Sequence, residues 1–232
     1  MTTLVLVRHG QASFGTRNYD CLSETGIRQS KVLGAHWSQL DTRWDLAFTG
    51  EMSRQRDTAS LSLTAANHSG IAMARPEFNE YDADAVVRSY LPVLARRHPE
   101  LSLDRRELFA DRKAFQLFFE KVIDCWLSGA AHDGGTLEGW VAFRDRCLDG
   151  LRAVVTPGGR ERRVVFTSGG VITVALQAAL GVDDAAAFRL NWRIYNAGQH
   201  VFRWGNRGLQ LLGFNNITHL EQAQDPALLT FR

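Results

Sequence analysis

The sequence predicts an α/β fold, a three-layer sandwich in which helices flank a mostly parallel central sheet, with a helical lid inserted. Short apolar runs that are typical of buried strands, such as Leu4 to Val7, alternate with longer helical patterns along the chain. This alternation is the pattern of a parallel sheet covered on both faces. The middle of the chain, from about residue 78 to 131, holds helical patterns without a strand signal, and this difference predicts the lid.

The first half of the chain gives its elements in a regular order. The first strand, Thr3 to Val7, ends at Arg8-His9-Gly10, and a polar loop from Gln11 to Cys21 follows it. Ser23 is expected to cap a helix that runs to about Leu40. The next expected elements are a strand, a helix and a third strand, at Asp45–Thr49, at Ser53 to about Ala66, and at Ile71–Met73.

The predicted lid contains two helical patterns, 83–97 and 111–127, joined by charged connectors. We expect this insertion to lie over the sheet. After Gly134-Gly135, Thr136 is expected to cap a helix that ends near the breaker Thr156-Pro157-Gly158-Gly159. Residues 1–232 are therefore expected to form a single domain with a lid insertion.

The last third of the chain returns to strand signals. A buried strand at Arg163–Thr167 leads through Ser168-Gly169-Gly170 into an apolar helix from Val171 to Leu180. Two late strands are expected near 198–204 and 208–214, and the tail after Phe214 is expected to be a loop along the surface.

Composition and charge argue against several classes of protein. The 232 residues are 45% hydrophobic and 22% charged, which is typical of a soluble globular protein that needs no disulfide or metal for its core. The net charge of +2 gives no support for nucleic-acid binding. The three cysteines lie far apart without a CxxC pair, which favours reduced thiols over a disulfide framework or a zinc site. No signal-peptide or membrane-spanning pattern is recognisable, so we expect a cytoplasmic protein that binds no membrane.

Polar residues that suit chemistry on an anion follow the first strand. The Arg8 guanidinium can bind phosphate oxygens in a fork, and the neutral imidazole of His9 can attack phosphorus. Gly10 allows the backbone to turn sharply and to approach a ligand. An ordinary polar loop after a buried strand is the alternative interpretation.

Three more positions fit the same chemistry. Arg54 lies in the first turn of its helix, where the N-terminus attracts anions. Glu80 enters the lid in position to give a proton to a leaving oxygen. The glycines after Ser168 leave backbone N–H groups that can cradle an oxyanion. Taken singly, a solvated arginine and a loop glutamate are the more common interpretations of Arg54 and Glu80, and a tight turn that needs glycine for packing is the alternative for the glycines.

Together and in this order, these residues resemble the histidine phosphatase superfamily, which has the phosphoglycerate mutase-like fold. The resemblance spans nearly the whole chain. The motifs that carry it are Arg8-His9-Gly10, the helix start Leu22-Ser23-Glu24-Thr25-Gly26, the stretch from Thr49 to Arg54 and on to Thr58-Ala59, the segment Asn79-Glu80, and Gly134-Gly135-Thr136.

The resemblance implies a role for each site residue. His9 is expected to be the nucleophile that forms a phosphohistidine, while Arg8 and Arg54 hold the phosphoryl oxygens. Glu80 is expected to protonate the leaving oxygen and then to help activate water. Phosphoryl transfer mostly requires positioning and charge stabilisation, so no metal and no cofactor are expected. Further phosphate or substrate contacts are expected from Gly10, Gln11, Ser13, Asn18 and Gly169.

Ser168 departs from the family pattern, because most members have a second histidine just before Gly-Gly. A serine hydroxyl can still donate to a phosphoryl oxygen, but a neutral hydrogen bond contributes about 0.5–1.5 kcal/mol against about 1.5–3 for a charged one. We therefore expect Ser168 to act in catalysis with reduced effect. His219, His200 and His132 are each expected to be core or surface residues rather than substitutes for the missing histidine.

The predicted function is a phosphomonoester hydrolase that acts on a small-molecule phosphate ester through a phosphohistidine on His9. We expect Ser168 to reduce its catalytic activity. One alternative, motivated by Ser168, is a member that binds a phosphorylated ligand with little or no turnover. A phosphoglycerate mutase is the other alternative. The sequence names neither the substrate nor the oligomeric state, and a homodimer stays open.

Overall fold

The structure, a computed structural model, describes residues 1–13, 20–97, 112–132, 136–155, 159–206 and 208–231. The chain divides into two compact units, one formed by Met1–Glu80 with Arg146–Arg232 and the other by Tyr81–Asp145. The first unit holds the sheet, and the described elements of the second are helical. The predicted α/β class with a mostly parallel sheet is confirmed.

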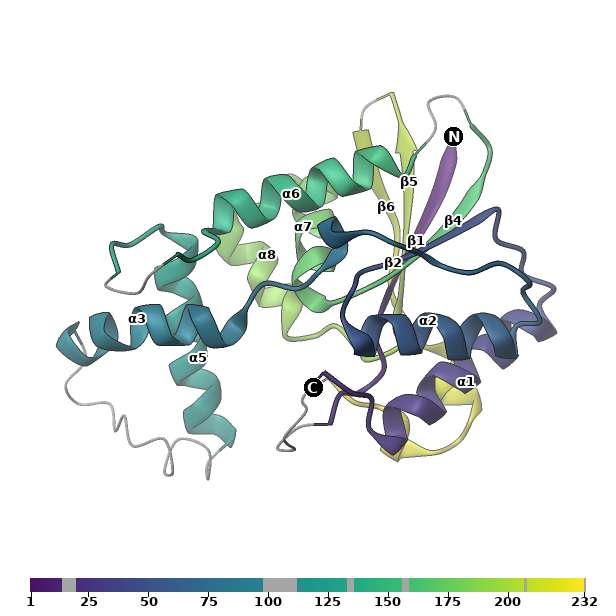
Figure 1. The fold of residues 1–232 in the computed structure, drawn as a ribbon, viewed down its shortest axis with the longest axis horizontal. Coiled ribbons are helices and arrows are strands. Elements are labelled where there is room, and N and C mark those ends of the chain that lie inside the picture. Colours follow the sequence, from purple (N-terminus) through teal and green to yellow (C-terminus); the bar gives the residue numbers. More distant parts are fainter. Residues whose placement is uncertain (14–19, 98–111, 133–135, 156–158, 207, 232) are drawn as a thin grey trace. The chain divides into compact units, whose positions relative to one another are not determined.

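The central sheet has six strands in the order β3-β2-β4-β1-β5-β6. Figure 1 labels all of them except the short β3. The four parallel strands are β1 (Thr2–Arg8), β2 (Leu46–Thr49), β3 (Met73–Ala74) and β4 (Arg162–Thr167). The two antiparallel strands are β5 (Gln199–Gly205) and β6 (Gly208–Asn216). Because β5 runs opposite to β1, the chain enters β5 at the edge of the sheet where β1 ends, and Gln199 pairs with Val7.

Strands β1 and β4 are buried almost throughout, because helices cover both faces of the sheet. On one face, Val5, Val7, Val164 and Phe166 form a cluster with apolar side chains of two helices, α1 (Glu24–Gln39) and α2 (Ser53–Ala65). On the opposite face, α7 (Gly169–Leu180) contacts β1 and β6 and packs beside α8 (Asp184–Asn191).

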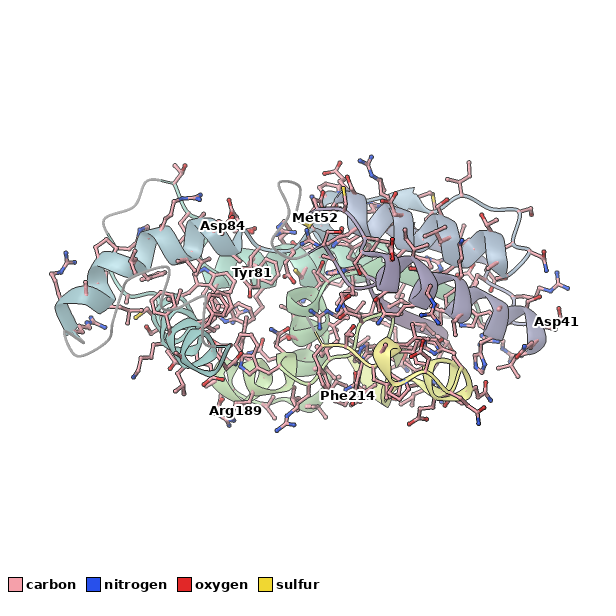
Figure 2. All side chains as sticks on the ribbon, turned by 90° about the horizontal axis from the view of Figure 1, so that it is seen from below. Asp41, Met52, Tyr81, Asp84, Arg189 and Phe214 are labelled. Atoms are coloured by element: carbon pink, nitrogen blue, oxygen red, sulfur yellow. The ribbon has the colours of Figure 1, made fainter. Side chains whose placement is uncertain are left out.

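Helices α1 and α2 lie side by side and run in the same direction. In Figure 2, Met52, which precedes α2, and Asp41, which follows α1, lie at opposite ends of this pair. The two backbones approach closely, since a Cβ added at Gly34 would lie 2.1 Å from the Ser62 carbonyl oxygen. The N-termini of both helices therefore lie at the carboxyl edge of the parallel strands.

The predicted helices of the insertion are confirmed as α3 (Ala83–Arg97) and α5 (Arg112–Leu127). An aromatic cluster forms part of the core of this second unit. Its members are Tyr81, Trp126, Trp140 and Phe143, with ring centroids of Tyr81 and Trp126 4.6 Å apart. The remaining described elements are α6 (Trp140–Ala153), α9 (Thr218–Gln222) and the short 3-10 helices η1 (Pro76–Phe78) and η2 (Pro226–Leu228).

Two predicted boundaries are wrong. The third strand is Met73–Ala74 rather than Ile71–Met73, and both of its residues are exposed. Thr136 does not begin a helix, because α6 begins only after Gly139, and the Glu138 carbonyl accepts a hydrogen bond from Trp126 Nε1 at 2.9 Å. The glycine pair before Thr136 lies outside the described residues.

The predicted surface loop after Phe214 is also wrong. The segment forms α9 and η2 and buries His219, Leu220 and Leu228. Both short helices contact α1. Helix α8 was not predicted either, although Asp183 caps it by accepting a hydrogen bond from Ala186 N. No helix within the described ranges is long and apolar enough to cross a membrane.

Candidate active site

His9 directly follows β1, at the carboxyl edge of the parallel strands, and its side chain is nearly enclosed. Nδ1 lies 2.7 Å from the Gly10 carbonyl oxygen, and Nε2 lies 3.2 Å from Nε of Arg54, which donates to it. Burial lowers the pKa of His9 well below its ordinary value, and the charges of Arg54 and Arg8 lower it further. The ring is therefore neutral, with the proton on Nδ1 and the lone pair on Nε2.

Arg54 lies in the first turn of α2, and its side chain is also buried. Its Nη1 donates to Asp20 Oδ1 at 2.8 Å, while Asp20 Oδ2 accepts a hydrogen bond from Ser53 N at 2.8 Å. Asp20 thus orients Arg54 and caps α2, whose own N-cap residue, Met52, has no side chain that can do so. Sequence reasoning missed Asp20, because a cap supplied from another segment leaves no local signal.

Arg8 is the last residue of β1 and is oriented by two carbonyl groups. Its Nη1 donates to the carbonyl oxygens of Ile194 and Phe231, each at 2.5 Å. Both acceptors come from parts of the chain that are more than a hundred residues away in sequence. The C-terminal segment therefore takes part in placing the first arginine of the site.

The turn before β5 supports the backbone of His9. Asn196 Nδ2 donates to the His9 carbonyl oxygen at 3.1 Å, and Ala197 N donates to the Arg8 carbonyl oxygen at 3.0 Å. Ala197 has φ +55°, a left-handed conformation that costs an alanine about 1–3 kcal/mol. Sequence reasoning did not single out Asn196 or Ala197, because their place depends on the antiparallel course of β5.

The loop after His9 is tied to the scaffold. Gly10 N donates to Thr58 Oγ1 at 2.9 Å, and a Cβ at Gly10 would lie only 2.5 Å from the Gly26 carbonyl oxygen. The Gln11 side chain accepts a hydrogen bond from Ser23 Oγ, the cap of α1, and Ser13 N donates to the Cys21 carbonyl oxygen. Asn18, predicted as a further contact, lies outside the described residues.

Glu80 meets the N-terminus of α7. Its Oε2 accepts a hydrogen bond from Gly170 N at 3.1 Å. A Cβ added at Gly169 would lie 2.5 Å from Asn191 Oδ1 and 3.9 Å from Glu80 Oε2, so the glycine allows these groups to come together. The structure thus places Glu80 and Gly169 beside each other.

Ser168 is completely buried at the end of β4. The preceding carbonyl, of Thr167, accepts a hydrogen bond from His9 N at 2.8 Å, which joins the ends of β4 and β1. Ser168 Oγ accepts a hydrogen bond from Gln55 Nε2 at 2.8 Å. Gln55 neighbours Arg54 in the first turn of α2 and was not singled out from the sequence.

Comparison with known proteins decides the family. Residues 4–217 match the model of the histidine phosphatase superfamily (branch 1). The chain belongs to the histidine phosphatase superfamily. Within the residues that the structure describes, no group of three or more His, Cys, Asp or Glu side chains is arranged to hold a metal ion.

Relatives in the superfamily include both mutases and phosphatases. The chain is 34% identical over 87 residues to a 2,3-bisphosphoglycerate-dependent phosphoglycerate mutase of Rhizobium meliloti, a match that covers 34% of this chain and 41% of the mutase. The match thus spans about two fifths of the mutase. A metal-independent phosphoserine phosphatase of Arabidopsis thaliana is 21% identical over 226 residues, which cover 95% of this chain and 84% of that protein.

Solved structures of the superfamily share the fold. A phosphoserine phosphatase from Entamoeba histolytica superposes with a TM-score of 0.64 at 16% identity, covering 95% of this chain and 100% of that chain. A phosphoglycerate mutase from Bacillus anthracis superposes with a TM-score of 0.62 at 16% identity, covering 97% of both chains. At these identities the likeness concerns the fold.

Three other histidines, His200, His219 and His132, were expected to be core or surface residues. His200 is buried in β5, where Nδ1 accepts a hydrogen bond from Asn215 N at 3.3 Å. His219 is buried in α9, and His132 belongs to the second unit. Among the described residues, no hydrogen bond joins any of the three to His9 or Ser168.

The buried histidines predict that the fold loses stability in acid. Burial lowers the pKa of His200 from 6.5 to about 3, and the charge of Arg8 adds to the effect. Between these values the unfolded chain binds the extra proton, so stability falls as the pH drops below 6.5, by about 1.4 kcal/mol per pH unit for each such histidine. His200→Gln should therefore reduce the loss of unfolding free energy between pH 6.5 and 5 by about 2 kcal/mol in urea titrations.

A histidine outside the core serves as the control. His68 is partly exposed, and His68→Gln is the matched replacement of a histidine that lies outside the core. If His200→Gln lost as much stability between pH 6.5 and 5 as the wild type does, the conclusion that His200 is neutral in the folded protein would be wrong.

Proposed function

We propose that this chain is a phosphatase that hydrolyses small phosphate monoesters through a phosphohistidine on His9. The observation that carries the proposal is the buried, neutral His9, whose Nε2 lone pair faces Nε of Arg54. A neutral imidazole is the nucleophilic form. An arginine at that nitrogen is placed to bind the group that the nitrogen attacks.

The first chemical step transfers the phosphoryl group to the enzyme. As the ester enters, the Arg54 guanidinium exchanges its hydrogen bond to His9 for bonds to phosphoryl oxygens. Nε2 of His9 then forms a bond to phosphorus while the ester P–O bond breaks, and the leaving oxygen takes a proton from Glu80. Arg8 and Arg54 offset the charge on the phosphoryl oxygens, as the transition state of phosphoryl transfer requires.

The second step returns the enzyme to its starting state. Glu80, now a carboxylate, accepts a proton from water, and the water oxygen bonds to phosphorus as the P–Nε2 bond breaks. Inorganic phosphate leaves, and His9 is neutral again. The two arginines supply the positive charge in both steps, so we infer that the reaction needs no metal ion and no cofactor.

Hydrolysis is favoured over mutase activity by the extent of the matches. The phosphoserine phosphatase of Arabidopsis thaliana matches 95% of this chain, whereas the phosphoglycerate mutase of Rhizobium meliloti matches 34% of it. We therefore infer a small phosphate ester as substrate, with phosphoserine as the first one to test. The cysteines Cys21, Cys125 and Cys147 are free thiols, which supports a reducing, cytoplasmic location.

The test is phosphate release from phosphoserine and from 4-nitrophenyl phosphate, with and without EDTA. We expect turnover that EDTA does not change. Binding of both esters without release of phosphate would support the alternative that the serine at position 168 motivates, a member that binds phosphorylated ligands. Interconversion of 2- and 3-phosphoglycerate at a higher rate than hydrolysis would support the mutase.

A further inference from the structure

Gln55 and Ser168 form a buried polar pair at the candidate site. Neither residue is exposed to solvent. Gln55 Nε2 donates two hydrogen bonds, one to Ser168 Oγ at 2.8 Å and one to the Phe78 carbonyl oxygen at 3.0 Å. The partners lie 113 residues apart in sequence and come together where α2 begins and β4 ends.

The pair fixes the direction of the Ser168 hydroxyl. An amide NH2 group only donates, so Ser168 Oγ must accept from Gln55, and the hydroxyl proton must point elsewhere. Among the described residues, no hydrogen bond from that proton to an acceptor is found. The pair therefore presents an oriented O–H donor.

The orientation of the Gln55 amide is itself fixed. Turning the amide over would set Oε1 against the Phe78 carbonyl oxygen, which already accepts hydrogen bonds from Gln55 Nε2 and from Thr167 Oγ1. In the observed orientation Oε1 is buried and has no hydrogen-bond partner among the described residues. An unsatisfied buried acceptor costs free energy. The two hydrogen bonds that Nε2 donates must offset this cost, so they maintain the observed orientation of the amide.

The pair lies next to the nucleophile. The Thr167 carbonyl, one residue before Ser168, accepts a hydrogen bond from His9 N at 2.8 Å. Arg54, one residue before Gln55, donates to His9 Nε2. His9 and Arg54 are each only 5% exposed, so full burial of Ser168 does not set it apart from the other site residues.

We propose that Gln55 is a positioning residue that holds the Ser168 hydroxyl as a donor to the phosphoryl group on His9, in place of the missing second histidine. The proposal rests on the proposed function and deepens it. In most of the superfamily a histidine side chain donates this hydrogen bond. Here the donor is the Ser168 hydroxyl, and Gln55 sets its orientation. Gln55 acts only through Ser168, so the effects of removing either residue must coincide.

A double-mutant cycle tests this coupling with two measurements. The first is the dissociation constant of orthovanadate, which imitates the transferred phosphoryl group and needs no turnover. The second is kcat and KM for 4-nitrophenyl phosphate. We expect Gln55→Met and Ser168→Ala each to weaken vanadate binding and to lower kcat by roughly tenfold, with KM little changed, because one donor to the transition state is lost. The double variant should be no worse than either single variant.

Two further variants separate positioning from packing. Gln55→Glu replaces the donor with an acceptor, so the Ser168 proton turns to the carboxylate, and vanadate binding should weaken more than in Gln55→Met. Gln199→Met is the matched control, because Gln199 is a buried glutamine whose Oε1 accepts a hydrogen bond from Trp37 Nε1 at 2.9 Å. It should lower the midpoint of urea unfolding and leave vanadate binding and kcat unchanged.

Three results would overturn the proposal. The first is a double variant whose loss is the product of the two single losses, since that means independent roles. The second is an unchanged vanadate constant in Ser168→Ala, and the third is Gln55→Glu binding vanadate as tightly as Gln55→Met does. The proposed function fails on a different result, namely equal phosphate release by the wild type and by His9→Ala.

Discussion

His9→Ala is expected to lower kcat for phosphate-ester hydrolysis by at least about 10⁴-fold, the scale seen when an enzyme loses its nucleophile. The reason is that Nε2 of His9 is the atom that accepts the phosphoryl group, and its neutral, buried state keeps the lone pair available. Arg8 and Arg54 remain in the variant, so binding of the ester should change by no more than about tenfold. Phosphate release and substrate titration measure the two effects separately.

The matched control for this experiment is His200→Gln, which also replaces a buried histidine but at a position without a bond to His9 among the described residues. Its kcat at pH 7 should stay close to that of the wild type. If His9→Ala kept a kcat within tenfold of the wild type, His9 would not be the nucleophile.

Arg54→Met is expected to lower kcat/KM by about 10³-fold, since an arginine that stabilises a transferring phosphoryl group contributes 10³–10⁵ in comparable enzymes. Two losses combine in this variant. The guanidinium no longer binds phosphoryl oxygens, and the Asp20 carboxylate, which Nη1 of Arg54 holds at 2.8 Å, loses this cationic partner, so its negative charge repels an anionic substrate more strongly.

The second loss can be measured by removing the Asp20 charge as well. Adding Asp20→Asn to Arg54→Met should restore kcat/KM severalfold, because the asparagine oxygen can still accept the hydrogen bond from Ser53 N without repelling the substrate. The same Asp20→Asn substitution in the wild type should lower kcat/KM, because it loosens the orientation of Arg54. A kcat/KM for Arg54→Met within tenfold of the wild type would contradict the role of Arg54.

Local patterns in the sequence predict where the chemistry gathers. Arg8 ends one apolar run, and His9 and Ser168 follow two such runs, which are typical of buried strands, and parallel strands end at one edge of a sheet. Arg54 begins a helix whose start, after β2, must lie at that same edge. This reasoning needs only local patterns and the geometry of a parallel sheet, and it predicts that His9, Arg54 and Ser168 lie in one region.

Residues that orient the site were not predictable in the same way. Asp20, Gln55 and Asn196 act on partners 34, 113 and 187 residues away in the sequence. Their residue types are common in loops and helix ends, so their roles depend on which segments the fold brings together. The antiparallel β5 is the clearest case, since its direction decides that Asn196 supports His9.

The errors in secondary structure have the same origin. Thr136 has the residue type of a helix cap, but the helix begins only at Trp140, and the Glu138 carbonyl before it accepts a hydrogen bond from Trp126 Nε1. The tail after Phe214 was expected to be a surface loop, yet Leu220 and Leu228 are buried with α9 and η2 beside α1. In both places packing between distant segments outweighs the local pattern.

Trapping of the phosphorylated enzyme tests the central claim most directly. The wild type would be mixed with ³²P-labelled ester, quenched within milliseconds in alkali, and digested to locate the label. We predict a phosphoramidate, stable in alkali and labile in acid, on the peptide that contains His9, and no label in His9→Ala. Steady hydrolysis by the wild type with no label on His9 at any quench time would contradict the account, because water would then attack the ester without a phosphohistidine.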